Sequence, residues 1–172
     1  MGEIKINLLP DAKPVRKRPY KLEHKYKYIV KKEIESMLVA GIIYSVYQSE
    51  WASPMVVHPK KHDPKKLRIC VDFRWLNRAT IIDPFPTPFA NEILNEVAGH
   101  ECYSFTDRFS GYNQVRIAKE DQHKTMFVCE FGSFAYRVMP FGLKNAPAVF
   151  SRIVEKAFQE YMYKSVGVYF DD

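Results

Sequence analysis

The stretch Val166-Gly167-Val168-Tyr169-Phe170-Asp171-Asp172 places two adjacent aspartates directly after an apolar, β-rich run. Aspartate is disfavoured in strands and neighbouring carboxylates repel each other, so this pair needs compensation. A third carboxylate, Asp107, follows a second strand-like run over residues 103–106. The three together would supply the hard oxygen ligands that Mg²⁺ prefers, whereas an Asp-Asp pair alone is more typical of a polar turn. The stretch therefore predicts a metal-binding sheet edge if other motifs accompany it.

The length and composition indicate one folded unit. The chain has 172 residues, of which 47% are hydrophobic, 27% charged and 15% aromatic. These values exclude a disordered tail, a collagen-like chain and a coiled coil. Its three cysteines are too few and too widely spaced for a disulfide framework or a CxxC zinc site, which favours a reducing compartment. No secretory signal is visible, and no run reaches the roughly 18 apolar residues of a membrane span.

The net charge of +6 is unevenly distributed. Residues 1–32 carry ten Lys/Arg against three acids, a local +7, and residues 58–78 carry seven against two, a local +5. The rest of the chain is therefore at −6. A basic part and an acidic part suggest a protein that holds a polyanion with one and cations with the other. A solubilising surface with a floppy basic arm fits the charges equally well.

Local patterns predict the elements of the N-terminal half. Three prolines among basic residues predict an extended arm over residues 1–20 rather than an element. Apolar residues at helical spacing over residues 26–38 predict an amphipathic helix that Gly41 ends as a C-terminal cap. Two β-branched runs, Met55–Val57 and Leu67–Val71, predict a hairpin. Its expected tip, residues 59–66, would present four lysines on a turn-forming loop, an arrangement suited to a phosphate.

The C-terminal half begins with a rigid proline-rich connector over residues 84–88, followed by a short helix ending near Gly99. A turn-and-helix segment is expected around Ser110-Gly111. The runs 126–131 and 134–138 predict a second hairpin that turns at Gly132-Ser133. A helix follows, with Asn145 as N-cap, Pro147 in its first turn, and an apolar face at positions 150, 153, 154, 157, 158 and 161.

Four further motifs accompany the paired aspartates. In chain order they are Trp51-Ala52-Ser53-Pro54, then Arg68-Ile69-Cys70-Val71-Asp72-Phe73-Arg74-Trp75-Leu76-Asn77, then Ser104-Phe105-Thr106-Asp107 with Ser110-Gly111-Tyr112-Asn113-Gln114, and Met139-Pro140-Phe141-Gly142-Leu143-Lys144-Asn145-Ala146-Pro147. With Tyr169-Phe170-Asp171-Asp172 they resemble, in order and spacing, the reverse transcriptase of gypsy-type long-terminal-repeat retrotransposons. The resemblance covers nearly the whole chain, from about Pro10 to Asp172, and five ordered motifs are far more specific than any one of them.

The resemblance implies an α+β fold, the fingers and palm of a right-hand polymerase, with an antiparallel palm sheet backed by helices. Residues 1–20 would form an extended basic arm, residues 21–81 and 115–145 the fingers, and residues 82–114 and 146–172 the palm. The thumb, the return strand after Asp172, and the protease, ribonuclease H and integrase of a Pol polyprotein would all be missing. The sequence thus looks like a Pol fragment truncated at the YFDD motif.

The implied activity is RNA-directed DNA polymerisation, in which a primer 3′-hydroxyl on an RNA or DNA template attacks the α-phosphate of a deoxynucleoside triphosphate. Asp107, Asp171 and Asp172 would hold two Mg²⁺ ions, or Mn²⁺ in their place, with the backbone carbonyl of Arg108 as a further ligand. Nucleotide binding would fall to Lys65, Lys66, Arg68, Tyr112 and Phe141. Template or primer contacts would come from Arg74, Gly142, Lys144 and Pro147.

By the same resemblance, the ring of Tyr112 would be the steric gate that excludes a ribose 2′-hydroxyl. An aromatic beside glycine is also typical of core packing, and the basic residues are also typical of a solvated surface. Arg108 departs from the family, which usually has an aliphatic or small residue there, and its cation could compete with Mg²⁺ or tether Asp107.

Two other interpretations stay open. One is a catalytically inactive nucleic-acid-binding remnant of a retrotransposon polymerase, and the other is an RNA-templated RNA polymerase, against which the bulky Tyr112 speaks. The resemblance implies a cytoplasmic virus-like particle or the nucleus as the location, with no membrane partner.

Overall fold

The computed structural model describes residues 2–60, 63–86, 91, 94, 95, 98, 102, 104, 111–162 and 166–168, and the side chains of all of these except residues 60 and 63–66. Within this part of the chain, the main sheet has five strands in the order β2-β7-β6-β3-β4. They are β2 (Ile43–Ser45), β7 (Gly132–Tyr136), β6 (Phe127–Cys129), β3 (Ser53–Lys60) and β4 (Asp63–Val71). Neighbouring strands are antiparallel except for the parallel pair β3 and β6.

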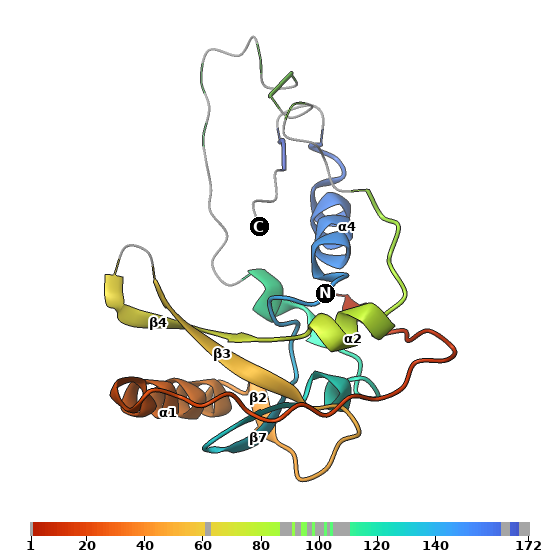
Figure 1. Cartoon of the computed structure of the whole chain (residues 1–172). Coiled ribbons are helices and arrows are strands. Elements are labelled where there is room, and N and C mark those ends of the chain that lie inside the picture. The colour runs from red at the N-terminus through yellow and green to blue at the C-terminus, as the bar shows by residue number, and fades with distance from the viewer. Residues whose placement is uncertain are drawn as a thin grey trace.

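The helices lie on different sides of this sheet (Figure 1). Helix α1 (His24–Val39) runs alongside the strands, whereas α4 (Ala146–Phe158) stands away from them, with α2 (Arg74–Ala79) near its foot. Two short 3₁₀ helices, η1 (Gly111–Gln114) and η2 (Gln122–Thr125), flank strand β5 (Arg116–Ile117). No helix in the described residues has both the length and the apolar character needed to span a bilayer.

Helix α1 matches the prediction from its periodicity. Val30 and Ile34 are buried on one face, and the helix ends where Gly41 takes a positive φ of 69°. The Gly41 N–H donates to the Leu38 carbonyl and the Ile42 N–H to the Met37 carbonyl, each at 3.0 Å. These two bonds form a Schellman motif, which satisfies carbonyls that the end of a helix leaves without partners.

One hydrophobic core connects the sheet to the helices on both sides. The Phe127 ring is fully buried and packs against Phe134 and Tyr136, with ring centroids 5.7 and 5.5 Å apart. The same core includes Val30 and Ile34 of α1, Leu76 of α2, Phe150 and Val154 of α4, and Ile4 and Ile6 near the N-terminus. Burial of these side chains holds together segments that are far apart in the sequence.

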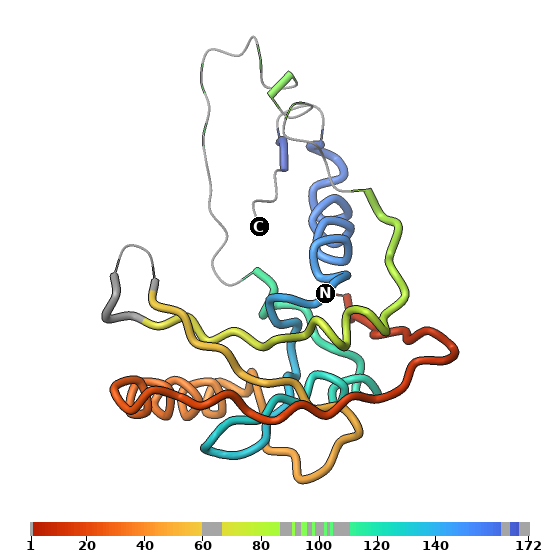
Figure 2. Tube along the Cα trace, in the orientation of Figure 1, coloured from red at the N-terminus to blue at the C-terminus, as the bar shows by residue number. Residues whose placement is uncertain are grey.

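The N-terminal segment differs from the predicted arm. Residues 2–17, here called the strap, are extended, but they are fastened to the body at several points (Figure 2). Strand β1 (Glu3–Ile4) pairs in parallel with β5, Leu8 bridges Thr80, and Arg16 bridges Ala52. The expectation of a segment without elements, and of a floppy arm, is therefore wrong. It failed because the strap has no periodicity of its own and takes its backbone partners from the rest of the fold.

Both hairpins form, but the strands of the first extend farther than predicted and the second turns at a different place. Strands β3 and β4 continue to the pair Lys60–Asp63, so most of the expected 59–66 loop is strand, with a register shift at Pro59/Lys60. In the second hairpin Cys129 pairs with Gly132, which places the turn at Glu130-Phe131 instead of Gly132-Ser133. Gly132 is the first residue of β7 and has a φ of 133°. The hydrophobic pairing of Phe127 with Phe134 decides the register over the local turn signal.

Helix α4 forms with Asn145 at the predicted N-cap position and Pro147 in its first turn, but two details differ from the prediction. The Asn145 side chain makes no capping hydrogen bond. Instead it accepts from the Asp83 N–H at 3.0 Å and donates to the Ile81 carbonyl at 2.8 Å. Along the predicted apolar face Phe150 and Val154 are buried, whereas Ala157, Phe158 and Tyr161 are exposed. The Asn145 side chain thus holds residues 81–83, just before the proline-rich connector, rather than the helix end.

Several predicted features lie outside the described residues. These are most of the helix before Gly99, the strand over residues 103–106, and the C-terminal end of the run 165–172. The two strands expected to carry the aspartates are among them.

Candidate nucleotide and nucleic-acid site

An aromatic cluster lies where η1, the segment before α4 and α4 itself meet. The Tyr112 ring contacts Phe141 edge-on at 4.7 Å between centroids and Phe150 at 5.1 Å. Phe150 is buried, Tyr112 is half-buried, and Phe141 is 68% exposed. Tyr112 therefore packs on the core residue Phe150 and also contacts the exposed Phe141 ring, so the core-packing interpretation is met in part, and the steric-gate role stays a prediction.

The turn that presents Phe141 is built around Gly142. Its φ of 92° is a backbone conformation that other residues rarely adopt. Asn77 of α2 holds this turn from the side, since its amide group donates to the Gly142 carbonyl at 2.7 Å and accepts from the Lys144 N–H at 2.8 Å. The sequence motifs named Tyr112 in one segment and Phe141 and Gly142 in another, and the structure brings the two segments together.

Lys144 and Pro147 follow this turn, and both have structural contacts. The Lys144 ammonium donates to the Thr80 carbonyl at 3.1 Å, so this cation is engaged within the chain. Pro147 is half-buried in the first turn of α4. The Lys144 ammonium therefore has fewer open donors than its sequence position suggests.

An ion pair connects α4 to Asp83, just before the proline-rich connector. The Arg152 guanidinium contacts both carboxylate oxygens of Asp83, at 2.7 and 2.8 Å, and lies over the Phe85 ring at 4.8 Å. Burial opposes ionisation of Asp83, but the hydrogen bonds from Arg152 and from the Phe85 N–H outweigh it and lower the pKa of this carboxyl. With Asn145, this pair fixes residues 81–85 against the N-terminal half of α4.

Arg74 is paired rather than free. Its guanidinium donates to both oxygens of Asp72, at 2.8 and 2.6 Å, and the Tyr20 hydroxyl adds a longer contact of 3.4 Å. The hydrogen bond from Arg74 is the main cause of a lowered pKa at Asp72, whose side chain is 8% exposed. The predicted template contact therefore carries a cation that a buried carboxylate largely neutralises.

Two other cationic side chains make cation–π contacts with Trp75, a residue that the sequence analysis did not name as a site residue. The Lys17 ammonium lies 4.3 Å from the centroid of the Trp75 ring and the Arg78 guanidinium 4.9 Å from it. Trp75 is 39% exposed, and Lys17 and Arg78 are exposed as well. Arg78 lies three residues after Trp75 on α2, which a helical spacing could have indicated. Lys17 comes from the strap, and only the tertiary structure brings it there.

The remaining predicted site residues lie either elsewhere in the fold or outside the described residues. Arg68 lies exposed on β4, in register with His58 of β3. Lys65 and Lys66 belong to β4 by their backbone, and their side chains are not among those described. Asp107, Arg108, Asp171 and Asp172 lie outside the described residues, and within the described part no group of three His, Cys, Asp or Glu could hold a metal ion.

Comparison with known proteins identifies the family. A family model described as reverse transcriptase (RNA-dependent DNA polymerase) matches residues 59–172. The chain belongs to the reverse transcriptase family. The Pol polyprotein of the Drosophila melanogaster transposon 297 is 34% identical over 162 residues, which cover 92% of this chain and 15% of that protein. The corresponding protein of the Drosophila transposon gypsy is 34% identical over 167 residues, 94% of this chain and 16% of its own length.

The reverse transcriptase chain also resembles solved structures. A foamy viral protease-reverse transcriptase in complex with double-stranded DNA superimposes with a TM-score of 0.85 at 23% identity, covering 99% of this chain and 29% of that one. This likeness confirms the predicted α+β fingers-and-palm fold. The retrotransposon relatives confirm the predicted gypsy-type ancestry. The chain spans only about 15% of the length of those polyproteins.

Proposed function

We propose that this chain is the fingers and palm segment of an RNA-directed DNA polymerase, which adds a deoxynucleotide to a primer 3′-hydroxyl on an RNA or DNA template. In this proposal residues 21–81 and 115–145 are the fingers, residues 82–114 and 146–172 the palm, and residues 1–20 an arm fastened across them. The observation that carries it is the cluster of Tyr112, Phe141 and Gly142, three motif positions from two distant segments that meet at one surface.

Tyr112 suits the role of a steric gate for physical reasons. Its ring is held edge-on by Phe150 and Phe141, so it cannot swing away without losing both contacts. A ring held in this way excludes a bulkier sugar by occupying its space, because displacing it costs packing energy. Phe141, mostly exposed beside it, offers a flat apolar surface for the sugar or base of the incoming nucleotide.

Nucleic-acid binding would use the basic surface of the strap and α2. Lys13, Arg16 and Lys17 of the strap and the following Arg18 are all exposed, and Lys17 shares the Trp75 ring with Arg78. The ring holds these two cations near each other, which lowers the entropic cost of placing both on one phosphate group. Such contacts would be independent of sequence and weakened by salt. Arg68, Lys65 and Lys66 of β4 would neutralise the triphosphate.

The proposed metal ligands are Asp107, Asp171 and Asp172 with the Arg108 carbonyl. Their fit to Mg²⁺ rests on the chemistry of the donors, since three carboxylates supply the oxygen ligands that this ion prefers. Bound Mg²⁺ would neutralise charge on the phosphates and lower the pKa of the attacking hydroxyl. The residues of the described site would orient the nucleotide sugar, hold the template and keep the gate closed.

Primer extension tests this proposal. The chain, at low salt with Mg²⁺, an RNA template and deoxynucleotides, should extend a primer, and the Asp107→Asn variant should not. A Tyr112→Val variant should incorporate ribonucleotides more readily. The control Tyr47→Val, which changes an exposed tyrosine distant from Tyr112 in the sequence, should not. Extension that survives Asp107→Asn would contradict the assignment of the metal ligands.

The second candidate is an inactive binding remnant. It is favoured by the exposed cations of the strap, which would bind a template whether or not catalysis survives. It predicts salt-dependent binding of the template without incorporation by any variant. If Arg108 is the cause, Arg108→Leu in a chain extended through a thumb should raise incorporation, and an unchanged rate would dismiss that explanation.

A further inference from the structure

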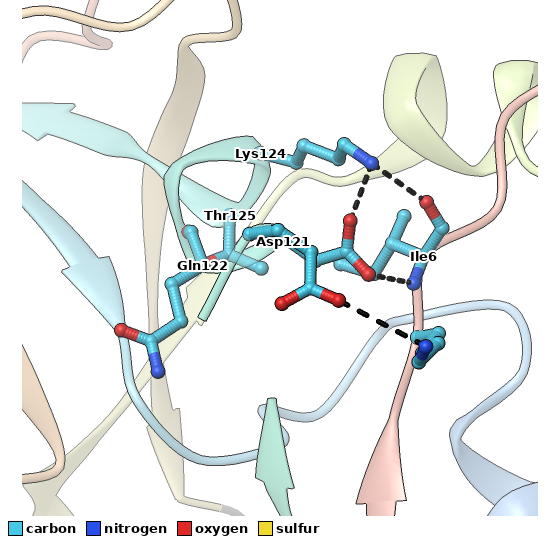
Figure 3. Close-up of polar contacts among 7 residues, drawn as sticks. Ile6, Asp121, Gln122, Lys124 and Thr125 are labelled. Atoms are coloured by element: carbon cyan, nitrogen blue, oxygen red, sulfur yellow. Dashed lines mark hydrogen bonds and ion pairs between the residues drawn. The ribbon is translucent and has the colours of Figure 1, made fainter. Parts of the chain in front are cut away.

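One largely buried ion pair holds the backbone of a single strap residue at both its N–H and its carbonyl. Asp121, 5% exposed, accepts the Ile6 N–H on Oδ2 at 2.8 Å, and its Oδ1 pairs with the Lys124 ammonium at 2.5 Å (Figure 3). The same ammonium donates to the Ile6 carbonyl at 2.9 Å. Ile6 is itself 3% exposed, so its N–H and C=O depend on these partners. Asp121 and Lys124 thus form a clasp around Ile6.

The strap, held by this clasp, pairs with one edge of strand β5. Two residues before Ile6, Ile4 pairs with Ile117, and the Ala118 N–H donates to the Ile4 carbonyl at 3.0 Å. On its other edge β5 is bonded to the segment over residues 137–139. There the Ile117 N–H donates to the Arg137 carbonyl at 2.9 Å, and the Met139 N–H donates to the Val115 carbonyl at 2.8 Å. Residues 115–118 therefore lie between the strap and this segment.

The β5 region and the segment over residues 137–139 both lead directly to the aromatic cluster. The Val115 N–H donates to the Tyr112 carbonyl at 3.1 Å, which closes η1. Met139 is two residues before Phe141. The beginning of the strap also lies beside α4, because a Cβ placed on Gly2 would lie 3.5 Å from Ile153, one turn after Phe150. The strap is thus paired with the strand that follows η1 and lies beside the helix that carries Phe150.

We propose that Asp121 is a positioning residue for this site: by clasping Ile6 it holds the strap on β5, and β5 in turn sets Tyr112 against Phe141. Asp121 touches none of the reacting groups and acts through the backbone. That Tyr112 and Phe141 serve a nucleotide rests on the proposed function, whereas the mechanical coupling from Ile6 to the rings does not.

Amide hydrogen exchange on the full 172-residue chain tests the coupling. Asp121→Asn keeps the shape of the side chain and removes the charge that pairs with Lys124. We expect exchange at Ile6, Ala118, Val115 and Met139 to accelerate roughly tenfold or more, because a charge-assisted buried contact is lost and the local opening becomes easier. Amides of the β3–β4 hairpin, such as Val57 and Ile69, should change less than about twofold.

The neighbouring Glu120 provides a matched control. It also pairs with the strap, to Lys5 at 3.9 Å, but both side chains are about two-thirds exposed. Glu120→Gln should therefore leave all of these exchange rates unchanged. If Asp121→Asn loosens Ile6 but not Val115 and Met139, the clasp only fastens the strap, and the positioning role is overturned.

A second variant covers the case in which Asp121→Asn loosens the whole fold. Lys124→Gln removes the same charge pair from the other side. Equal acceleration in the β3–β4 hairpin and around the rings, in both variants, would make the clasp a general stabilising contact and would overturn the proposal. Where the chain extends primers, the KM for the deoxynucleotide should rise more than kcat falls. Absence of extension would affect the proposed function only and leave the exchange comparison decisive.

Discussion

Replacing Gly142 by alanine should destabilise the chain by about 1–2 kcal/mol through the backbone alone. Gly142 has a φ of 92°, and an added Cβ would meet Phe73 and the Val71 carbonyl at 3.7 Å, which is ordinary van der Waals contact. The cost therefore comes from conformational strain and not from a clash. For a chain of this size it corresponds to a fall in Tm of roughly 2–8 °C.

A substitution at Gly41 serves as a control that separates the free-energy cost of backbone strain from any effect on the candidate site. Its φ is 69°, and a Cβ there would meet nothing within 4 Å, so Gly41→Ala should cost about 1 kcal/mol at the end of α1. Only Gly142→Ala should also disturb the site, because the Gly142 carbonyl and the Lys144 N–H share the Asn77 amide. Gly41→Asn should recover part of the loss, since asparagine tolerates a positive φ better than alanine.

The assay is urea unfolding of both variants followed by circular dichroism, combined with nuclear magnetic resonance of the Tyr112 and Phe141 rings. We expect comparable losses of unfolding free energy and a change of ring contacts in Gly142→Ala alone. A loss below about 0.3 kcal/mol in both variants would refute the strain argument. A loss above about 4 kcal/mol in Gly142→Ala would show that packing, and not backbone conformation, limits this position.

Three further predictions concern charge and burial. The pKa of Asp72 is lowered in the folded chain, so its ionised carboxylate stabilises the fold above its unfolded pKa, and this contribution is lost as the pH falls through its folded pKa. The free energy of unfolding, measured by urea titration, should therefore differ less between pH 7 and pH 3 in Asp72→Asn than in the parent chain. Lys17→Gln should weaken binding of a single-stranded oligonucleotide and reduce the slope of log affinity against log salt by about 1. The control Lys156→Gln, on α4, should leave that slope unchanged. Equal effects of the two substitutions would contradict the role of the cations at Trp75. Ser151 is buried with no hydrogen-bond partner for its hydroxyl among the described residues, so Ser151→Ala should raise the free energy of unfolding by about 1 kcal/mol, and a loss of stability in thermal melts would show that the hydroxyl has a partner.

Local patterns predicted elements where one periodicity dominates. The apolar spacing of residues 26–38 and Gly41 predicted α1 and its end, and the β-branched runs predicted the β3–β4 hairpin. The turn at Gly132-Ser133 was wrong because cross-strand pairing of Phe127 with Phe134 outweighs a local turn signal. Asn145 was misread because the same side chain can cap a helix or bond a distant backbone, and sequence does not say which is nearer.

The candidate site was predictable as a set of positions but not as an arrangement. Tyr112, Phe141 and Gly142 were found from the motifs that resemble reverse transcriptases, and the structure adds that the two rings touch and that Asn77 holds the turn. The Trp75 cations were missed because Lys17 lies 58 positions before the ring in the printed sequence. The metal-binding aspartates remain a prediction, since they lie outside the described residues.

The amino-acid sequence alone was enough to predict the family, helices α1 and α4, and the β3–β4 and β6–β7 hairpins, and it named the candidate residues for the chemistry. These properties depend on residue type and spacing along the chain. Only the tertiary structure decided that the basic N-terminal residues form a fastened strap, that Arg74 and Lys144 are engaged within the protein, and that Asp121 and Lys124 clasp Ile6. The physical reason is that buried backbone groups and charges must find partners, and the fold selects those partners from distant segments of the chain.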